Sequence, residues 1–254
     1  MEKIKKTEYR APALEKGLEI IELLASEGGA MSKKLIAEKL DRSVNEIFRM
    51  LQVLEDKQYI SFDYDTSSYT LTLKMFALSN QHSPIALLLK QAKPLLEKLC
   101  HKVNQSCHIS MYSNGELVVI AKQESPYKMG FSLQVGSQLN ICSSGSGIVL
   151  LTFSDEVIRH RILNTIDDTE DEKQTALNEL DLTRLQGYFV GSSPQISGIT
   201  NISAPVFDVY SGVMAIITIP FMTLNSNTVH HHIENIEFTR NELLTIANKL
   251  SQNL

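Results

Sequence analysis

The N-terminal part of the chain has apolar residues spaced for helices. Between residues 13 and 25 they recur every three or four positions, at Leu14, Leu18, Ile21 and Leu24–Ala25, which is the spacing of an amphipathic helix. Gly28 and Gly29 follow and predict the end of this helix, because glycine adopts the backbone conformation that often closes one. A second, short helix is expected after Ser32, whose hydroxyl can cap free N–H groups.

A third helix is predicted from Ser43, where Ser43-Val44-Asn45-Glu46 matches a capping box. In this motif the serine and the glutamate each bond the backbone N–H of the other. The apolar face of the helix would hold Val44, Ile47, Leu51 and Leu54. The apolar period then falls to two in residues 59–62 and 69–73, which predicts two strands joined by a polar turn. Three helices followed by a hairpin are typical of a winged helix-turn-helix.

The rest of the chain mixes helices and strands. Residues 76–103 have a helical apolar pattern that Pro94 interrupts, so two helices or a kink are expected there. Strands are predicted at residues 107–112 and 117–122, and helices at 157–166, 171–186 and 233–250. Asp208 is the one formally charged residue between Leu185 and Ile233, which indicates a buried sheet. The predicted fold class is therefore α+β.

Composition and charge narrow the function classes. The chain has 254 residues, 43% of them hydrophobic, which suffices for one large domain or two ordinary ones. The net charge is −5, and residues 1–75 contain one more acidic than basic side chain. A DNA contact would therefore depend on where the basic groups lie and not on their number. An odd count of three cysteines suits a reducing compartment, and neither a signal peptide nor a run of about 20 apolar residues is seen. A cytoplasmic protein that does not enter a membrane is expected.

Motifs along both parts of the chain have the order and spacing of a known family. In the N-terminal part they are Ala13-Leu14, Ile47-Phe48-Arg49-Met50-Leu51 with Leu54, and Asp63 with Tyr69-Thr70-Leu71. The C-terminal motifs are more specific, namely Glu124-Ser125-Pro126, Val135-Gly136, Ser144-Gly145-Ser146-Gly147, Leu150-Leu151, Gly187-Tyr188, Gly198-Ile199 and Ala204-Pro205-Val206-Phe207-Asp208. In this ordered set the chain resembles the IclR-type bacterial transcriptional regulators over almost its full length.

The resemblance implies a winged helix-turn-helix DNA-binding domain (residues 1–76), a helical linker (77–104) and a GAF-like α/β effector-binding domain (105–254). The implied function is that of a sequence-specific transcriptional regulator, more often a repressor than an activator. Such a protein binds double-stranded operator DNA and is controlled by a small organic acid. Because a palindromic operator requires two DNA-reading helices, a homodimer or a dimer of dimers (homotetramer) is expected.

The predicted DNA-reading surface is the polar side of the third helix, where Asn45, Phe48, Arg49 and Gln52 face outward. Asn45 and Arg49 share one face and can pair with base edges or bind phosphates. Ser43 and the free N–H groups of the helix start suit a phosphate. Further phosphate contacts are expected from basic residues before this helix and in the N-terminal tail, namely Lys33, Lys34, Arg42, Lys3, Lys5, Lys6 and Arg10. Glu46 departs from the small hydroxyl residue that is common in the family, and we interpret it as the capping partner of Ser43 rather than as a base-reading residue.

The predicted effector site begins at Ser143-Ser144-Gly145-Ser146-Gly147, which precedes the apolar run Ile148–Leu151. This order predicts a helix N-terminus, whose free N–H groups favour a carboxylate and whose glycines let a ligand approach the backbone. Ser144, Gly145 and Ser146 are the candidate ligand contacts of this turn. By resemblance the opposite wall of the site would include Asn201 and Thr218, with Phe131 and Leu139 as apolar lining and Gly191 as a further site position. Gly191, Ser192 and Ser193 stand where relatives have acidic residues, and Ile148 replaces a common lysine, so the pocket is expected to be less charged than usual.

Metal and catalytic sites are disfavoured by the spacing of the reactive residues. Cys100-His101 and Cys107-His108 match no standard zinc motif, and buried cysteines with surface histidines are the favoured interpretation. His230-His231-His232 lies in a polar segment and is interpreted as solvated. Ser146 lacks the Gly-x-Ser-x-Gly frame, and no nucleotide-binding loop is found.

Neither a metal, a cofactor nor enzymatic activity is therefore expected. Two other functions stay open. A small-molecule sensor or protein-interaction module without DNA binding would explain Glu46 and the missing basic excess. An enzyme with Ser144 or Ser146 as its nucleophile is the third possibility.

Overall fold

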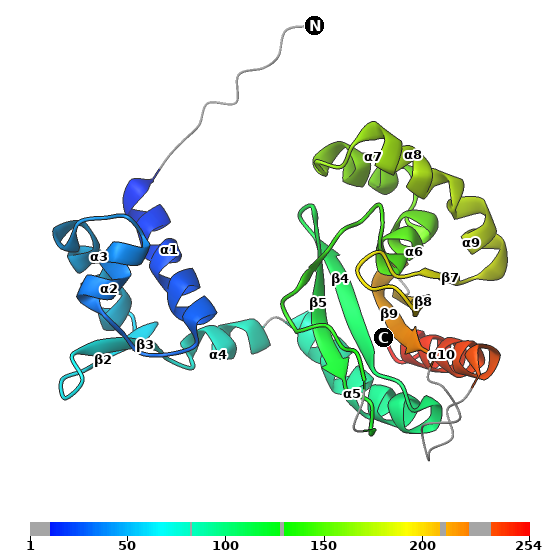
Figure 1. Ribbon diagram of the computed structural model, residues 1–254, viewed down its shortest axis with the longest axis horizontal. Helices are drawn as coiled ribbons and strands as arrows, with labels where there is room; N and C mark the ends of the chain where they lie inside the picture. The colour runs from blue at the N-terminus through cyan, green and yellow to red at the C-terminus, as the bar shows by residue number, and fades with distance from the viewer. Residues whose placement is uncertain (1–10, 82, 128–129, 209–211, 224–234) are drawn as a thin grey trace, which may run out of the picture. The chain divides into compact units, whose positions relative to one another are not determined.

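The chain folds into two compact units, Met1–Ser83 and Pro84–Leu254 (Figure 1). The computed structural model describes residues 11–81, 83–127, 130–208, 212–223 and 235–254. Lys3, Lys5, Lys6, Arg10 and His230–His232, which the sequence singled out, lie outside the described residues. Helices and antiparallel strands occur together in both units, so the predicted α+β class is confirmed.

The first unit is a winged helix-turn-helix, as predicted. Its three antiparallel strands lie in the order β1, β3, β2. Its elements are α1 (Pro12–Glu27), β1 (Met31–Ser32), α2 (Lys33–Lys39), α3 (Val44–Asp56), β2 (Ile60–Asp63), β3 (Ser68–Leu71) and α4 (Lys74–Asn80). The two-residue strand β1 was not predicted, because it is too short for an alternating pattern, and it pairs Met31 with Tyr69. Ser32 caps α2 as expected, accepting a hydrogen bond from the backbone N–H of Leu35.

Two details of the predicted apolar faces are wrong in this unit. In α1 the buried residues are Gly17, Ile20 and Leu24, whereas Leu14 and Leu18 are 63% and 48% exposed. In α3, Ile47 and Leu51 are buried as predicted, but Val44 is 36% exposed. Both helices have more apolar residues than one face can hold, so the pattern alone did not decide which of them meet the core.

The second unit is built on a six-stranded antiparallel sheet with the strand order β6-β5-β4-β9-β8-β7. Its strands are β4 (Cys107–Ser113), β5 (Glu116–Gln123), β6 (Gln138–Leu139), β7 (Phe189–Ser192), β8 (Ile199–Asp208) and β9 (Gly212–Met222). Its helices are α5 (Ser83–Val103), α6 (Gly145–Phe153), α7 (Glu156–Thr165), α8 (Glu170–Asn178), α9 (Leu180–Gln186) and α10 (Ile236–Ser251). Two apolar cores lie on opposite faces of the sheet: α5 and α10 form one, and α6 to α9 form the other (Figure 1).

Three predicted segments can be compared with the structure. α5 continues through Pro94 as one helix, so the alternative of two separate helices at this proline is wrong, and Ala92 and Leu95 on either side of it are buried in the core. The predicted helix 171–186 is divided at Glu179 into α8 and α9. The boundary between the units crosses the predicted linker 77–104, since α5 packs in the core of the second unit. Within the described residues, no helix is both long enough and apolar enough to cross a membrane.

Candidate functional site

The start of α3 is fixed by the predicted capping box. The backbone N–H and the hydroxyl of Ser43 both donate to Oε2 of Glu46, at 3.0 and 2.9 Å. The backbone N–H of Glu46 donates back to Oγ of Ser43 at 3.3 Å. Nζ of Lys16 on α1 lies 3.0 Å from Oε1. The hydrogen bond from the Ser43 backbone and then the Lys16 ammonium lower the pKa of Glu46 to about 2. Glu46 therefore acts as a charged cap, as its interpretation from sequence proposed.

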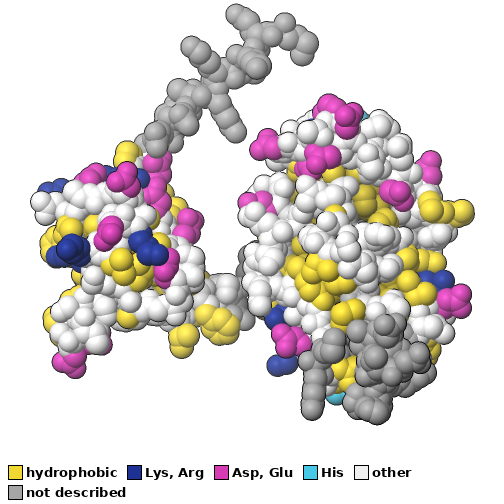
Figure 2. Space-filling model, in the orientation of Figure 1, with side chains coloured by type: hydrophobic (Ala, Val, Ile, Leu, Met, Phe, Trp, Pro, Cys, Tyr) yellow, Lys and Arg dark blue, Asp and Glu magenta, His cyan; other side chains and the backbone are white. Residues whose placement is uncertain are grey.

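The polar face of α3 is open to solvent. Asn45, Phe48, Arg49 and Gln52 are all exposed, as is Ser43 at the helix start. Nζ of Lys33 lies 4.7 Å from the centroid of the Phe48 ring, so a cation of α2 is held next to the face of α3 by a cation–π contact. Lys34 is exposed on the same short helix. Figure 2 shows Lys and Arg side chains of this unit spaced among hydrophobic and acidic ones, without a continuous basic coat.

Arg42 differs from the other basic residues that were predicted to contact DNA. Its Nε and Nη2 atoms make hydrogen bonds of 2.9–3.0 Å to both carboxylate oxygens of Glu19 on α1. This two-pronged ion pair joins α1 to the turn before α3. It counts against the predicted phosphate contact of Arg42, because the guanidinium already has an anionic partner inside its own unit.

A buried polar row crosses the second sheet beneath the start of α6. His108 on β4 is paired in register with Thr218 on β9, which is paired with Ser203 on β8. Oγ1 of Thr218 lies 2.8 Å from both Oγ of Ser203 and Oγ of Ser146 in the first turn of α6. Ser144 caps this helix by accepting the N–H of Gly147 at 3.1 Å. The predicted helix N-terminus is therefore present, and it covers polar side chains.

Seven of the eight predicted effector-site residues line one small cavity at this place. They are Phe131, Leu139, Ser144, Gly145, Ser146, Asn201 and Thr218, and the remaining lining residues are His108, Leu133, Gln195 and Pro220. The free volume is about 10 Å³, which is room for about one water molecule. No local pattern pointed to His108, Leu133, Gln195 or Pro220, because each comes to the cavity only when segments distant in the chain are brought together.

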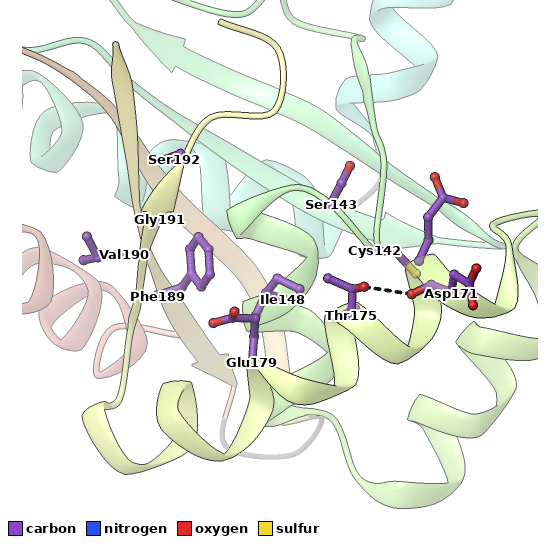
Figure 3. Close-up of a pocket in the computed structure, with 12 residues that line it drawn as sticks. Cys142, Ser143, Ile148, Asp171, Thr175, Glu179, Phe189, Val190, Gly191 and Ser192 are labelled. Atoms are coloured by element: carbon purple, nitrogen blue, oxygen red, sulfur yellow. Dashed lines mark hydrogen bonds between the residues drawn. The ribbon is translucent and has the colours of Figure 1, made fainter. Parts of the chain in front are cut away.

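Gly191, the eighth predicted residue, lines a separate cavity of 490 Å³ between α8, β7 and the start of α6 (Figure 3). The ring of Phe189 lies between the two cavities. A Cβ atom on Gly145 would be 2.8 Å from Cδ1 of Phe189, and one on Gly191 would be 2.5 Å from Cζ. Asp171, Glu172 and Glu179 also line the larger cavity, which makes it unfavourable for an anion.

The glycines of the α6 turn serve packing within the protein. The space beside Gly145 is filled by Phe189 and Ser203, and a Cβ on Gly147 would overlap the backbone of Ile141. The space that a side chain would take at these two glycines is therefore filled by the protein, whereas Gly145 still lines the small cavity. What the turn offers a ligand is the polarity of its N–H and hydroxyl groups.

His108 is a buried residue, which corrects the prediction of a surface histidine. It is 3% exposed, and its Nδ1 has no hydrogen-bond partner among the described residues. Burial lowers its pKa to about 4, so the ring is neutral at pH 7. Cys100 and Cys107 are buried, as predicted, and so is Cys142. Sγ of Cys100 lies 3.2 Å from Sγ of Cys107 in the core shared by α5 and the sheet.

Comparison with known proteins agrees with this architecture. The model of the bacterial transcriptional regulator IclR C-terminal domain matches residues 83–252, and that of the IclR helix-turn-helix domain matches residues 13–63. The HTH-type transcriptional regulator KdgR of Dickeya chrysanthemi is 26% identical over 203 residues, 78% of this chain and 67% of that protein. The HTH-type transcriptional repressor AllR of Salmonella typhi is 26% identical over 215 residues, 82% of this chain and 79% of that protein.

Solved structures share the whole fold. An IclR homolog from Microbacterium hydrocarbonoxydans, complexed with 4-hydroxybenzoate, has a TM-score of 0.77 at 15% identity and covers 95% of this chain and 98% of its own. Pseudomonas aeruginosa HmgR has a TM-score of 0.73 at 22% identity, with 96% and 99% covered. The family consists of transcriptional regulators, so the prediction that the chain is not an enzyme is confirmed. With both characteristic domains matched in order, the chain belongs to the IclR family of bacterial transcriptional regulators.

Proposed function

We propose that this chain is a transcriptional repressor that binds a palindromic operator as a homodimer and is controlled by a small carboxylic acid. The observation that carries the proposal is the exposed polar face of α3, held at its start by a capping box. A helix fixed in this way and open on one side suits the major groove. The relatives named AllR are repressors, which favours repression over activation.

Asn45 and Arg49 are the proposed base-reading pair. They are one helical turn apart, and both are exposed. Arginine can donate two hydrogen bonds to guanine, and asparagine can pair with adenine. Lys33, Lys34 and the helix start at Ser43 would contact phosphates. Glu46 does not oppose this role, because its charge is already bound to the Ser43 backbone and to Lys16.

The test is the affinity of Arg49→Ala for the DNA upstream of the gene, measured by fluorescence anisotropy at fixed salt. Loss of a bidentate base contact costs about 1–3 kcal/mol, which is roughly a 5- to 150-fold weaker affinity. Arg49→Lys is the matched control, since lysine keeps the positive charge but cannot donate the two parallel hydrogen bonds of a guanidinium. It should retain most of the salt dependence while discriminating less between operator and mutated operator. Unchanged affinity of Arg49→Ala would refute the assignment.

A carboxylate is the proposed ligand of the small cavity. The N-terminus of α6 supplies free N–H groups and partial positive charge. The buried polar side chains beneath it cost free energy in an apolar core, so a ligand that binds them would explain why they are there. The M. hydrocarbonoxydans homolog was crystallised with an aromatic carboxylic acid, which supports this ligand class. Since the cavity has room for about one water, an acid can enter only if the lining side chains move apart.

A homodimer seam is proposed on exposed apolar side chains of the first unit. In addition to Leu14 and Leu18 on α1, α4 exposes Met75, Phe76 and Leu78. Figure 2 shows hydrophobic side chains grouped over α4. Two reading helices of a dimer must be about 34 Å apart to reach successive major grooves.

A regulator that senses a ligand without binding DNA is the second candidate. One observation favours it: Lys16, Lys39 and Arg42 each form an ion pair with a glutamate of the same unit. These pairs reduce the positive charge that a phosphate backbone would meet. Specific retardation of operator DNA that weakens steeply with salt would exclude this candidate.

A further inference from the structure

The sheet face beneath α6 contains buried polar groups that have no partner among the described residues. Nδ1 of His108 and Oγ of Ser110 are buried, and neither has a hydrogen-bond partner among the described residues. Both lie on the face of β4 that is turned away from Cys107 and Ile109, which belong to the core with α5. A buried polar group without a hydrogen bond destabilises the folded protein, and such groups therefore point to a partner that is bound at another time.

The surroundings of His108 favour an anionic partner. The described lining of the cavity contains no Asp, Glu, Lys or Arg, so no carboxylate of the protein competes for the site. The N-terminus of α6 and the hydroxyls of Ser144 and Ser146 are at the same cavity. A carboxylate bound there would lie between the helix N-terminus and the imidazole, and both would interact favourably with its charge.

We propose that His108 selects the ligand of this cavity by donating a hydrogen bond from Nδ1 to a carboxylate at the α6 N-terminus, and that its ring takes up a proton from solvent as the anion binds. This inference rests on the proposed role of the cavity as the effector site. It adds a ligand contact on β4, selection of an acid over its amide, and a dependence of affinity on pH.

The dependence on pH has a defined sign. Without ligand, burial holds the pKa of His108 at about 4, and a bound carboxylate raises it, because an adjacent negative charge favours imidazolium. Affinity therefore rises as pH falls from 7 toward the pKa of the free protein. Lys122, the register partner of His108 on β5, is paired with Glu124 at 2.8 Å. α6 and β9 have no titratable side chain, and β8 has only Asp208, at its far end.

The experiment measures binding of formate, acetate, propionate and benzoate, each against its amide, by thermal shift and calorimetry between pH 5.5 and 8. The wild-type protein should bind at least one acid in preference to its amide and more tightly at low pH. His108→Leu should lower the affinity for that acid about tenfold or more, because one hydrogen bond to a charged group is lost. His108→Asn can keep a donor near the position of Nδ1 but cannot titrate, so it should bind the acid with an affinity that varies little with pH.

Ring-nitrogen chemical shifts of His108, assigned by comparison with His108→Asn, give a direct readout that does not depend on folding stability. They should report protonation at higher pH in saturating acid than without it. Wild-type affinity in a folded His108→Leu, or an unchanged His108 titration with acid bound, would overturn the inference alone. Failure of every acid to bind the wild-type protein would overturn both the inference and the carboxylate effector, whereas operator binding is tested separately with Arg49→Ala.

Discussion

Gly147→Ala should be the most disruptive single-methyl change at the proposed effector site. Gly147 lies in the first turn of α6, where the backbone of Ile141 passes against the helix. A Cβ on Gly147 would lie 2.6 Å from both C and Cα of Ile141 and nearer still to the carbonyl oxygen. Ordinary contacts begin at 3.4 Å, so the two backbones must separate by about 0.8 Å or more. Neither of them is a flexible side-chain end that can swing away.

The cost follows from the kind of atoms that collide. Overpacking a well-filled core costs about 1–3 kcal/mol, and a clash between two backbones belongs at the upper end of this range. A loss of about 3 kcal/mol in the free energy of unfolding corresponds to a melting temperature lower by roughly 6–12 °C for a domain of this size. Displacement of the first turn of α6 away from the turn at Ile141 would also disturb the contact between Ser146 and Thr218, so acid binding should weaken together with stability.

Differential scanning calorimetry of the full-length protein is the assay, because the two units can unfold in separate transitions. Gly17→Ala is the matched control: it lies in the interior of α1, and its Cβ would meet nothing within 4 Å. This change should stabilise the first unit by about 0.5–1 kcal/mol, since alanine is the better helix former. A melting temperature of Gly147→Ala within a degree of wild type would show that the packing argument is wrong.

Three further predictions concern other parts of the molecule. The pKa of Glu46 is about 2 in the folded protein against 4.5 ordinarily, so its stabilising contribution is present above pH 4.5 and is lost as pH falls toward 2. Glu46→Gln should therefore make the stability of the first unit depend less on pH in this range. An unchanged acid unfolding profile would contradict the capping role. Phe189→Ala should join the small cavity to the 490 Å³ cavity and shift the thermal-shift preference from propionate toward benzoate, whereas an unaltered preference would show that the ring is no barrier. Leu18→Asp should place a charge in the proposed dimer seam, so light scattering should report monomers at concentrations at which the wild-type protein is dimeric. An unchanged molecular mass would show that Leu18 of α1 is not part of the dimer interface.

The interactions that could be predicted from the sequence are those between residues only a few positions apart in the chain. The capping box of α3 is an example, because Ser43 and Glu46 are three residues apart and their bonds need only a helix to form. The ion pair of Arg42 with Glu19 spans 23 residues and left no local signal. In α1, the exposed residues Leu14 and Leu18 and the buried residue Ile20 are equally apolar, so the choice of face depended on α3 and not on α1 itself.

His108 shows why the pocket was only partly predictable. It stands between Cys107 and Ile109, and in a sheet with one covered face this alternation places a polar residue in solvent. Here helices cover both faces of the sheet, so the same alternation buries the histidine on the α6 side. Ser144, Gly145 and Ser146 were predicted from the local pattern of a helix start, whereas Phe131, Leu139, Asn201 and Thr218 came from family resemblance, which carries information about neighbours in space that periodicity lacks.

The position of the cavity on the sheet bears on how a ligand could influence DNA binding. A ligand shifts an equilibrium only if it binds one conformation better, and a cavity with a free volume of about 10 Å³ must widen to accept any acid. β4 lines the cavity with His108, and on its other face Cys107 contacts Cys100 of α5. α5 is also the element through which the chain enters the second unit from the first. We therefore expect that widening at His108 would displace β4 against α5. Because α5 joins the two units covalently, this displacement offers a route by which a ligand could influence operator binding.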